Sequence, residues 1–383
     1  MEVKELEEHI RALATVDETE SPLISCYIDL SGKAIGREEL DARLQLLRKS
    51  LAVGSAVAFD EAANRIKRCL EGVIPPRTRG MALFARGGES PFWRALHFEI
   101  PLPNWIAVGS TPNIYHLVEL KDNYDRYVIL LTTETSARII GVNLGSVTAN
   151  LWRSRPELRR RIGHEWTRDH YQDHRRERTK QFLHDQIRSL DQLISAGGYA
   201  HLILAGNARM ISAVRKELPK RLAEKLVDSV PAASTDHVSD IVASTLQAFL
   251  EHEELESQAL AETLITQIRT HGLAVAGARA SMDAIRAGQG DYLVLVKGFD
   301  PGQGWECRDC GKMELELPLP NVCPGCSSGR FREFDIRGEL VRLAEQHRVG
   351  VEIVEHNDVL MNLGGVGCLV RYLAPANYLY PAA

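Results

Sequence analysis

The sequence predicts an α/β protein with three layered α/β domains in series, the third of which carries a four-cysteine zinc ribbon. Strand-like and helical segments alternate along the whole chain. At 383 residues the chain is too long for one ordinary hydrophobic core. Two Cys-x-x-Cys pairs interrupt the last series of strands and helices. With 44% hydrophobic and 25% charged residues, the composition is that of a globular protein.

We expect the domains at 1–124, 125–250 and 251–383. The first should contain helices over 1–20, 37–51 and 59–70 and strands over 22–30, 80–85 and 93–100. The second should contain a strand meander over 127–132, 137–142 and 146–152, a long helix over 167–196, a strand over 201–205 and helices over 208–226 and 236–269. The third should contain strands over 274–277, 291–296 and 351–354, helices over 279–287 and 338–347, the ribbon at 303–330, and a glycine-rich turn at 363–367 into a last strand.

Several classes of protein are excluded by the composition. No apolar run is long enough to span a membrane, and the charged N-terminus is not a signal peptide. Cys26, Cys69 and Cys368 fall in expected strands or a helix, where reduced and partly buried thiols are common. We therefore expect a cytoplasmic protein.

The most unusual part of the sequence is the basic stretch Leu151–Lys180, which lies in a chain whose net charge is −5. Clustered arginines usually bind phosphate. They also occur on solvated helices, where a pair such as Glu157 and Arg161 stabilises one exposed face. Both interpretations stay open on charge alone. Aromatic and imidazole side chains lie among the cations: Trp152, His164, Trp166, His170, Tyr171 and His174.

The strongest single motif is a pair of Cys-x-x-Cys knuckles, Cys307 with Cys310 and Cys323 with Cys326. Their spacing is typical of a four-thiolate zinc ribbon, and two disulfides or a redox pair are the alternative. Since protein ligands fill all four positions, the Zn²⁺ should be structural.

Other motifs fail on spacing. The segment that begins at His164 and Glu165 resembles the metalloprotease motif HExxH, but Arg168 stands where the second histidine must fall. His170 and His174 have the i,i+4 spacing of metal ligands but no evident third ligand. Glycine-rich segments at 302–304 and 363–367 are not followed by the Lys-Ser/Thr of a phosphate loop, and no nucleophile elbow is present in the sequence.

The ordered set of features resembles the eukaryotic and archaeal peptide-chain release factors and their relative Pelota, over nearly the entire chain. Ser21–Leu30 is similar to the opening strand of that family, and Arg126–Leu144 to the start of its middle domain. His201–Asn207, which reads HLILAGN, is similar to the strand and turn of that family that contain the sequence Leu-Ala-Gly. The segments Gly272–Ala287 and Leu363–Tyr372, together with the cysteine ribbon, resemble its third domain.

Both functional motifs of that family are altered in this sequence. At the position of the catalytic tripeptide GGQ the chain reads Gly163-His164-Glu165. Histidine restricts a backbone that needs glycine, and glutamate places an anion among RNA phosphates unless it is protonated or paired with Arg161 or Arg168. The stop-codon motif NIKS is expected within 50–60, where the chain reads SLAVGSAVAFD.

The resemblance therefore implies a translation factor that binds the ribosomal A site without releasing peptide, in hibernation or on stalled ribosomes. Its first domain would reach the decoding centre, and its third would face a translational GTPase, with elongation factor Tu as the candidate. Neither a membrane nor DNA is an expected partner. Within the basic stretch, arginines would contact rRNA phosphates, and His164 or Trp166 would stack on a base. The expected rRNA-binding residues are Arg153, Arg155, Arg159, Arg160, Arg161, Gly163, His164, Trp166, Arg168, Arg175, Arg176 and Arg178.

Two other functions stay open from the sequence. One is a peptidyl-tRNA hydrolase, in which His164 or Glu165 orients water in place of glutamine. The other is a zinc-ribbon RNA-binding or scaffold protein that does not use the A site.

Overall fold

The computed structural model describes residues 2–32, 37–51, 53–154, 168–318 and 320–372. It shows a mixed α/β chain with four sheets, in agreement with the predicted class. Close contacts group the chain into two compact units, one made of Met1–Asp122 with Glu254–Ala383 and the other of Asn123–Glu253. The second unit spans about the same residues as the expected middle domain, whose bounds stay a prediction. The separation of the first and third domains stays a prediction.

The first part of unit 1 is an antiparallel sheet with strand order β3-β2-β1-β4. Helices α2 and α3 pack on it through one core, because Leu40 and Leu44 of α2 and Phe59 and Ile66 of α3 fall on single apolar helix faces. The elements are α1 (Val3–Ala14), β1 (Leu23–Asp29), α2 (Arg37–Lys49), the 3-10 turn η1 (Val53–Ser55), α3 (Ala56–Glu71), β2 (Gly80–Arg86), β3 (Phe92–Phe98), β4 (Trp105–Gly109) and α4 (Tyr115–Asn123).

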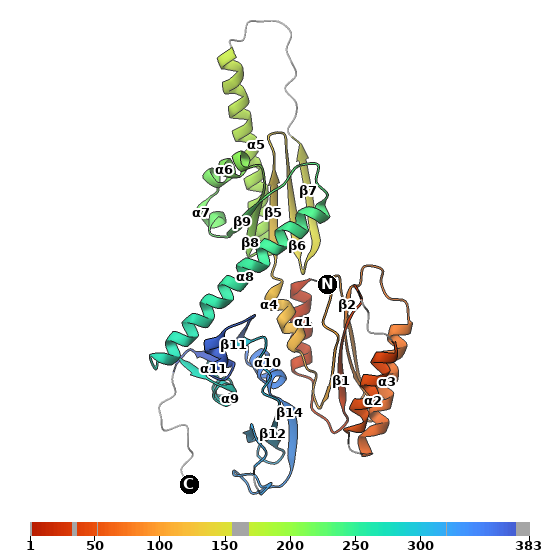
Figure 1. Cartoon of the computed structure of the whole chain (residues 1–383). Coiled ribbons are helices and arrows are strands. Elements are labelled where there is room, and N and C mark those ends of the chain that lie inside the picture. Colours follow the sequence, from red (N-terminus) through yellow and green to blue (C-terminus); the bar gives the residue numbers. More distant parts are fainter. Residues whose placement is uncertain (1, 33–36, 52, 155–167, 319, 373–383) are drawn as a thin grey trace. The chain divides into compact units, whose positions relative to one another are not determined.

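Unit 2 is a five-stranded sheet with strand order β7-β6-β5-β8-β9 and helices on both faces (Figure 1). One face packs on α5, whose apolar residues recur from Leu183 to Ile194, and on α6 and α7. The other face packs on the start of α8 around Phe249. The elements are β5 (Tyr127–Thr132), β6 (Ser136–Asn143), β7 (Ser146–Ser154), α5 (Arg168–Gly197), β8 (His201–Gly206), α6 (Ala208–Glu217), α7 (Lys220–Ala223), β9 (Leu226–Pro231) and α8 (Val238–Arg269).

The last part of unit 1 holds a mixed sheet, β10-β16-β11-β15, and a small antiparallel sheet, β13-β12-β14. Asp335 caps α10 by accepting a hydrogen bond from the Gly338 backbone N–H at 2.7 Å. The elements are β10 (Ala274–Ala276), α9 (Ala278–Arg286), β11 (Gly290–Val296), β12 (Gln303–Cys307), β13 (Met313–Glu314), β14 (Phe331–Asp335), α10 (Ile336–His347), β15 (Gly350–Val354), α11 (Asp358–Asn362) and β16 (Val366–Val370).

One expected helix is wrong. The segment predicted as a single helix over 208–226 is α6, the short α7 and the start of β9. Helix α6 ends at Glu217, and its C-cap Leu218 is extended because the residue before a proline disfavours the helical conformation. Strand β4 and helices α4 and α11 were not expected from the sequence. Among the helices that the structure describes, none is long and apolar enough to cross a membrane.

Candidate metal centre and candidate nucleic-acid interface

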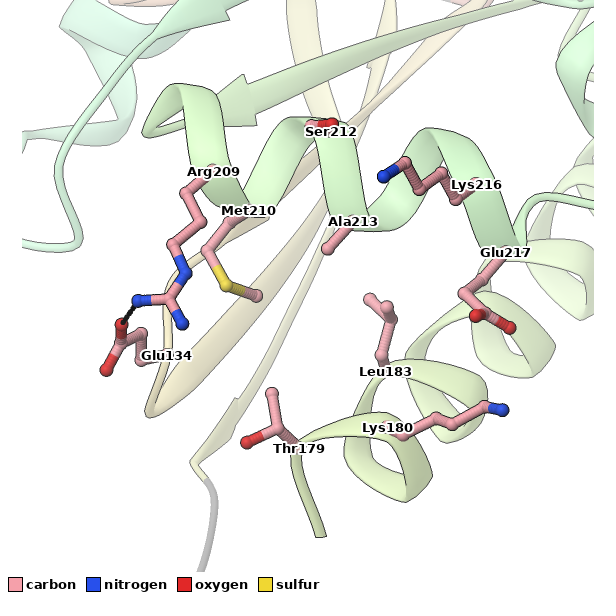
Figure 2. Close-up of a pocket in the computed structure, with 10 residues that line it drawn as sticks. All are labelled: Glu134, Thr179, Lys180, Leu183, Arg209, Met210, Ser212, Ala213, Lys216 and Glu217. Carbon is pink, nitrogen blue, oxygen red and sulfur yellow. Dashed lines mark hydrogen bonds and ion pairs between the residues drawn. The ribbon is translucent and has the colours of Figure 1, made fainter. Parts of the chain in front are cut away.

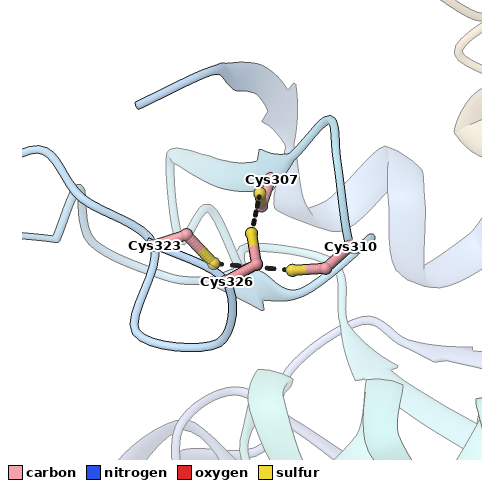
Figure 3. A group of neighbouring side chains, drawn as sticks. All are labelled: Cys307, Cys310, Cys323 and Cys326. Atoms are coloured by element: carbon pink, nitrogen blue, oxygen red, sulfur yellow. Dashed lines mark hydrogen bonds between the residues drawn. The ribbon is translucent and has the colours of Figure 1, made fainter. Parts of the chain in front are cut away.

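The four cysteines of the two knuckles converge at one point (Figure 3). Cys307 ends β12, Cys310 lies in the turn before β13, and Cys323 and Cys326 lie in the loop before β14. Their sulfur atoms all lie within 4.8 Å of one another. The Cys307 and Cys326 sulfurs are 3.4 Å apart, and those of Cys310 and Cys323 are 3.5 Å apart.

This arrangement fits a tetrahedral metal ion. Zn–S bonds of 2.3 Å place two sulfurs of a tetrahedral site about 3.8 Å apart, within the range of the observed separations. A disulfide needs about 2.05 Å, so the sulfurs are not joined in pairs. The four-cysteine cluster can therefore bind a metal, and the four soft thiolate ligands favour zinc.

The turns of the two knuckles differ in detail. Gly311, which follows Cys310, has φ +70°, and Ser327, which follows Cys326, has φ +59°. Both residues are thus in the left-handed region, which favours glycine. At Gly325 an added Cβ would lie 3.3 Å from Cδ of the flexible Lys312 side chain, which can move aside.

Hydrogen bonds favour the thiolate form of one ligand. Burial opposes ionisation of the Cys307 thiol, but bonds from the Cys310 backbone N–H and from the neighbouring thiols lower its pKa to about 7. A thiol whose pKa is already lowered loses its proton to solvent more readily when its thiolate binds the metal.

The basic stretch joins β7 to α5, as the sequence predicts. Arg153 is exposed on β7, and Arg178 is exposed on α5. The helix begins at Arg168, but the side chains of Arg168, Arg175 and Arg176 lie outside the described part of the structure. The same holds for the rest of the expected loop: Arg155, Arg159, Arg160, Arg161, Gly163, His164, Glu165 and Trp166.

A groove of about 700 Å³ lies between α5 and α6 (Figure 2). Thr179, Lys180 and Leu183 line it from α5. Glu134, from the turn between β5 and β6, closes one end. The side chains from α6 are Arg209, Met210, Ser212, Ala213, Lys216 and Glu217.

Both carboxylates of the groove have basic partners. Arg209 Nη1 lies 3.3 Å from Glu134 Oε1. His184 Nε2 lies 2.8 Å from Glu217 Oε2, and this hydrogen bond, together with the charge of Lys180, lowers the pKa of Glu217. Three cations, Lys180, Arg209 and Lys216, line the groove against these two carboxylates, so the groove has an excess of positive charge.

The groove lies at the end of unit 2 from which the basic stretch leaves the sheet. Ser154, the last residue of β7, pairs with Ser136, directly after the turn that carries Glu134. Arg153, Arg178 and the cations of the groove therefore belong to one end of the unit. Arg209 and Lys216 were not predicted as binding residues from the sequence, although their spacing of seven residues places them on one side of a helix.

Comparison with known proteins finds likenesses in the middle of the chain. Residues 112–250 match the family model of bacterial archaeo-eukaryotic release factor family 10. Peptide chain release factor subunit 1 of Thermococcus onnurineus is 26% identical over 152 residues, and that of Thermococcus kodakarensis is 25% identical over 152 residues. Each match covers 35% of this chain and 37% of the relative. The middle of the chain is therefore similar to the bacterial archaeo-eukaryotic release factors and to archaeal release factor subunit 1, of which it spans about a third.

Solved structures of Pelota proteins align over most of the chain, but with low TM-scores. Archaeoglobus fulgidus Pelota aligns with a TM-score of 0.38 and 12% identity, over 97% of this chain and 92% of that one. An archaeal Pelota from a model of ribosome-bound Pelota and ABCE1 aligns with a TM-score of 0.42 and 14% identity, over 97% and 94%.

Proposed function

We propose that this protein is a translation factor that binds the ribosomal A site without releasing the nascent peptide, in ribosome hibernation or on stalled ribosomes. One observation carries the proposal. A segment of release-factor type, residues 112–250, keeps the basic stretch but reads Gly163-His164-Glu165 where the family's catalytic tripeptide is expected. The sequence also resembles the hibernation factor Balon in lacking the same two motifs, and this resemblance supports the proposed role.

The chemistry of the altered tripeptide argues against peptide release. A glycine lets the backbone approach the ester bond of peptidyl-tRNA, and a histidine side chain at that position restricts the backbone. A glutamate beside RNA phosphates is costly as an anion, so it is unsuited to the role of a neutral glutamine.

The described cations support binding to RNA. Arg153, Arg178 and Lys180 are exposed where the basic stretch leaves and re-enters unit 2, and Arg209 and Lys216 lie beside them in the groove. Such cations bind phosphate without regard to base sequence and fix the orientation of a protein on RNA. In this proposal residues 125–250 reach toward the peptidyl-transferase centre.

The flanking domains complete the proposal. Residues 1–124 would occupy the decoding centre without reading a stop codon, since the NIKS motif is missing. Residues 251–383 would face a translational GTPase, with elongation factor Tu as the candidate. The metal of the four-cysteine cluster would be a structural zinc, because no ligand position is left for water or substrate.

Sedimentation with ribosomes tests the binding. The protein should pellet with ribosomes at low salt, and the logarithm of the affinity should fall linearly with the logarithm of the salt concentration. Arg153→Glu and Arg178→Glu should each weaken binding and reduce the salt slope by about one. Lys220→Glu is the matched control, since Lys220 is an exposed cation of the same unit whose side chain is 92% exposed on α7. Failure to pellet at low salt, with or without the GTPase, would overturn the proposal.

A release assay on ribosomes that carry peptidyl-tRNA tests the missing reaction. We expect no release above background. Release that is lost in His164→Ala and Glu165→Ala would instead assign a peptidyl-tRNA hydrolase. Crosslinks to rRNA away from the decoding and peptidyl-transferase regions would assign an RNA-binding scaffold.

A further inference from the structure

A second feature of unit 2 is an exposed aromatic side chain that is paired with an arginine across two strands. Trp152 of β7 lies opposite Arg138 of β6 in the register of the sheet. The guanidinium carbon of Arg138 lies 5.4 Å from the centre of the Trp152 ring. Arg138 Nε donates a hydrogen bond of 2.9 Å to Oδ1 of Asn150, which is two residues before Trp152. We refer to Arg138, Asn150 and Trp152 as the stacking platform.

The stacking platform is held in place but not covered. The hydrogen bond to Asn150 fixes the guanidinium, and the cation–π contact fixes the indole ring. The Trp152 side chain is nevertheless 49% exposed. Asn150 pairs with Ile140, which packs in the core beneath α8, so the platform lies on the α8 face of the sheet. β7 is also the edge strand of this sheet, and none of the described strands pairs with its outer side.

The strands that carry the stacking platform have a charge that favours an anionic partner. No aspartate or glutamate occurs from Ser136 to Ser154, which spans β6 and β7. The strand continues directly through Arg153 into the basic stretch. The nearest acidic residue before β6, Glu134, is paired with Arg209. An exposed indole backed by a guanidinium, in a segment without carboxylates, is the chemistry that binds an unpaired nucleobase.

We propose that the stacking platform binds a flipped-out or single-stranded RNA base, which stacks on Trp152 while the guanidinium of Arg138 attracts its phosphate. The proposal rests on the proposed RNA-binding function and adds a defined contact to it. Stacking is tolerant of sequence because every base has a π face, so the platform would position the protein without selecting a codon.

Binding of a fluorescein-labelled, mixed-sequence single-stranded RNA decamer to the full chain, measured by anisotropy, tests the proposal. Trp152→Ala should weaken binding about 10-fold without changing the salt slope, because it removes stacking and no charge. Trp152→Phe should restore most of the affinity. Leu151→Ala is the matched control, since Leu151 is an adjacent exposed side chain, 45% exposed, on the opposite face of the same strand.

Arg138→Ala should weaken the affinity as well and lower the salt slope by about one, because it removes a charge together with the support of the ring. Thermal unfolding of each variant within a few degrees of the wild type would show that the fold is intact, as expected for exposed positions. Equal RNA binding by Trp152→Ala and wild type would overturn the proposal. Wild-type protein that binds an extended apolar peptide through Leu151 and Trp152, but does not bind RNA, would also overturn the proposal.

The outcomes separate this inference from the proposed function. A decamer that binds through Trp152 while the protein fails to pellet with ribosomes would keep the platform and reject the ribosomal role. Ribosome binding that is unchanged in Trp152→Ala, together with unchanged decamer binding, would reject the platform alone.

Discussion

Removal of the metal should unfold the ribbon over 303–335 and leave the neighbouring sheet β10-β16-β11-β15 folded. The perturbation is either a strong zinc chelator or the substitution Cys310→Ser, which removes an exposed ligand without opening a cavity in a core. The expectation follows from how little apolar surface the ribbon buries.

The size of the effect can be estimated from the buried side chains. Phe334 is the one large apolar side chain, cysteines aside, that is buried among the described residues of the ribbon. Its burial stabilises the fold by about 2–3 kcal/mol. Ordering a single residue costs about 1–2 kcal/mol, so this contact can order only a few residues. A structural zinc contributes about 10–16 kcal/mol to such a site.

Hydrogen exchange measured by mass spectrometry is the assay. After chelation, amides of β12 and β14 should exchange at the rate of an unfolded peptide, while amides of β11 and β16 should keep their protection. Metal analysis should give one zinc for each wild-type chain and a clear loss for Cys310→Ser. Cys69→Ser is the control, because Cys69 is half-buried on α3 outside the cluster. Protection of β12 and β14 that survives metal removal would refute the reasoning.

Three further predictions concern single substitutions, each checked by thermal or chemical unfolding. Gly311 and Ser327 both have φ in the left-handed region, which favours glycine. Gly311→Ala should therefore destabilise the ribbon by about 1 kcal/mol, because it places a Cβ at such a position, whereas Ser327→Gly removes one and should not destabilise it. Equal losses of stability in the two variants would contradict this. Asn207→Ala should destabilise unit 2 by about 1 kcal/mol, since the Asn207 side chain caps α6; an unchanged midpoint would show that the cap is unimportant. Burial raises the pKa of Glu352 despite a hydrogen bond from Ser257. The native protein should therefore lose stability as the pH rises from about 4.5 through the raised pKa of Glu352. The variant Glu352→Gln should be more stable than wild type at pH 7 but not at pH 4. A stability difference that does not depend on pH would contradict the assignment.

Most of the fold could be predicted because the apolar pattern matches the periods of the elements. The meander and the long helix of unit 2 were predicted from such patterns, and β5 and α5 do bury those apolar residues. Strand β9 was missed because Leu226–Pro231 has only three apolar side chains and a proline, and its strand character comes from parallel pairing with β8. Proline at 219 already indicated the end of α6, and the helical prediction ran past it.

The candidate sites could be predicted only in part. The cysteine spacing alone predicts the cluster, because four thiols in two knuckles have one common arrangement. The groove between α5 and α6 depends on how two helices separated by strand β8 pack on one sheet face, which local patterns do not determine. The pairing of Arg138 with Trp152 depends on strand register, which a slip of one residue would change.

A reconstruction by electron microscopy of the protein bound to ribosomes with peptidyl-tRNA in the P site is the most direct test of the central claim. We expect density for the chain in the A site, with the basic stretch against rRNA near the peptidyl-transferase centre and the peptidyl-tRNA ester intact. Density outside the A site, or an emptied P-site tRNA that depends on His164 and Glu165, would contradict it.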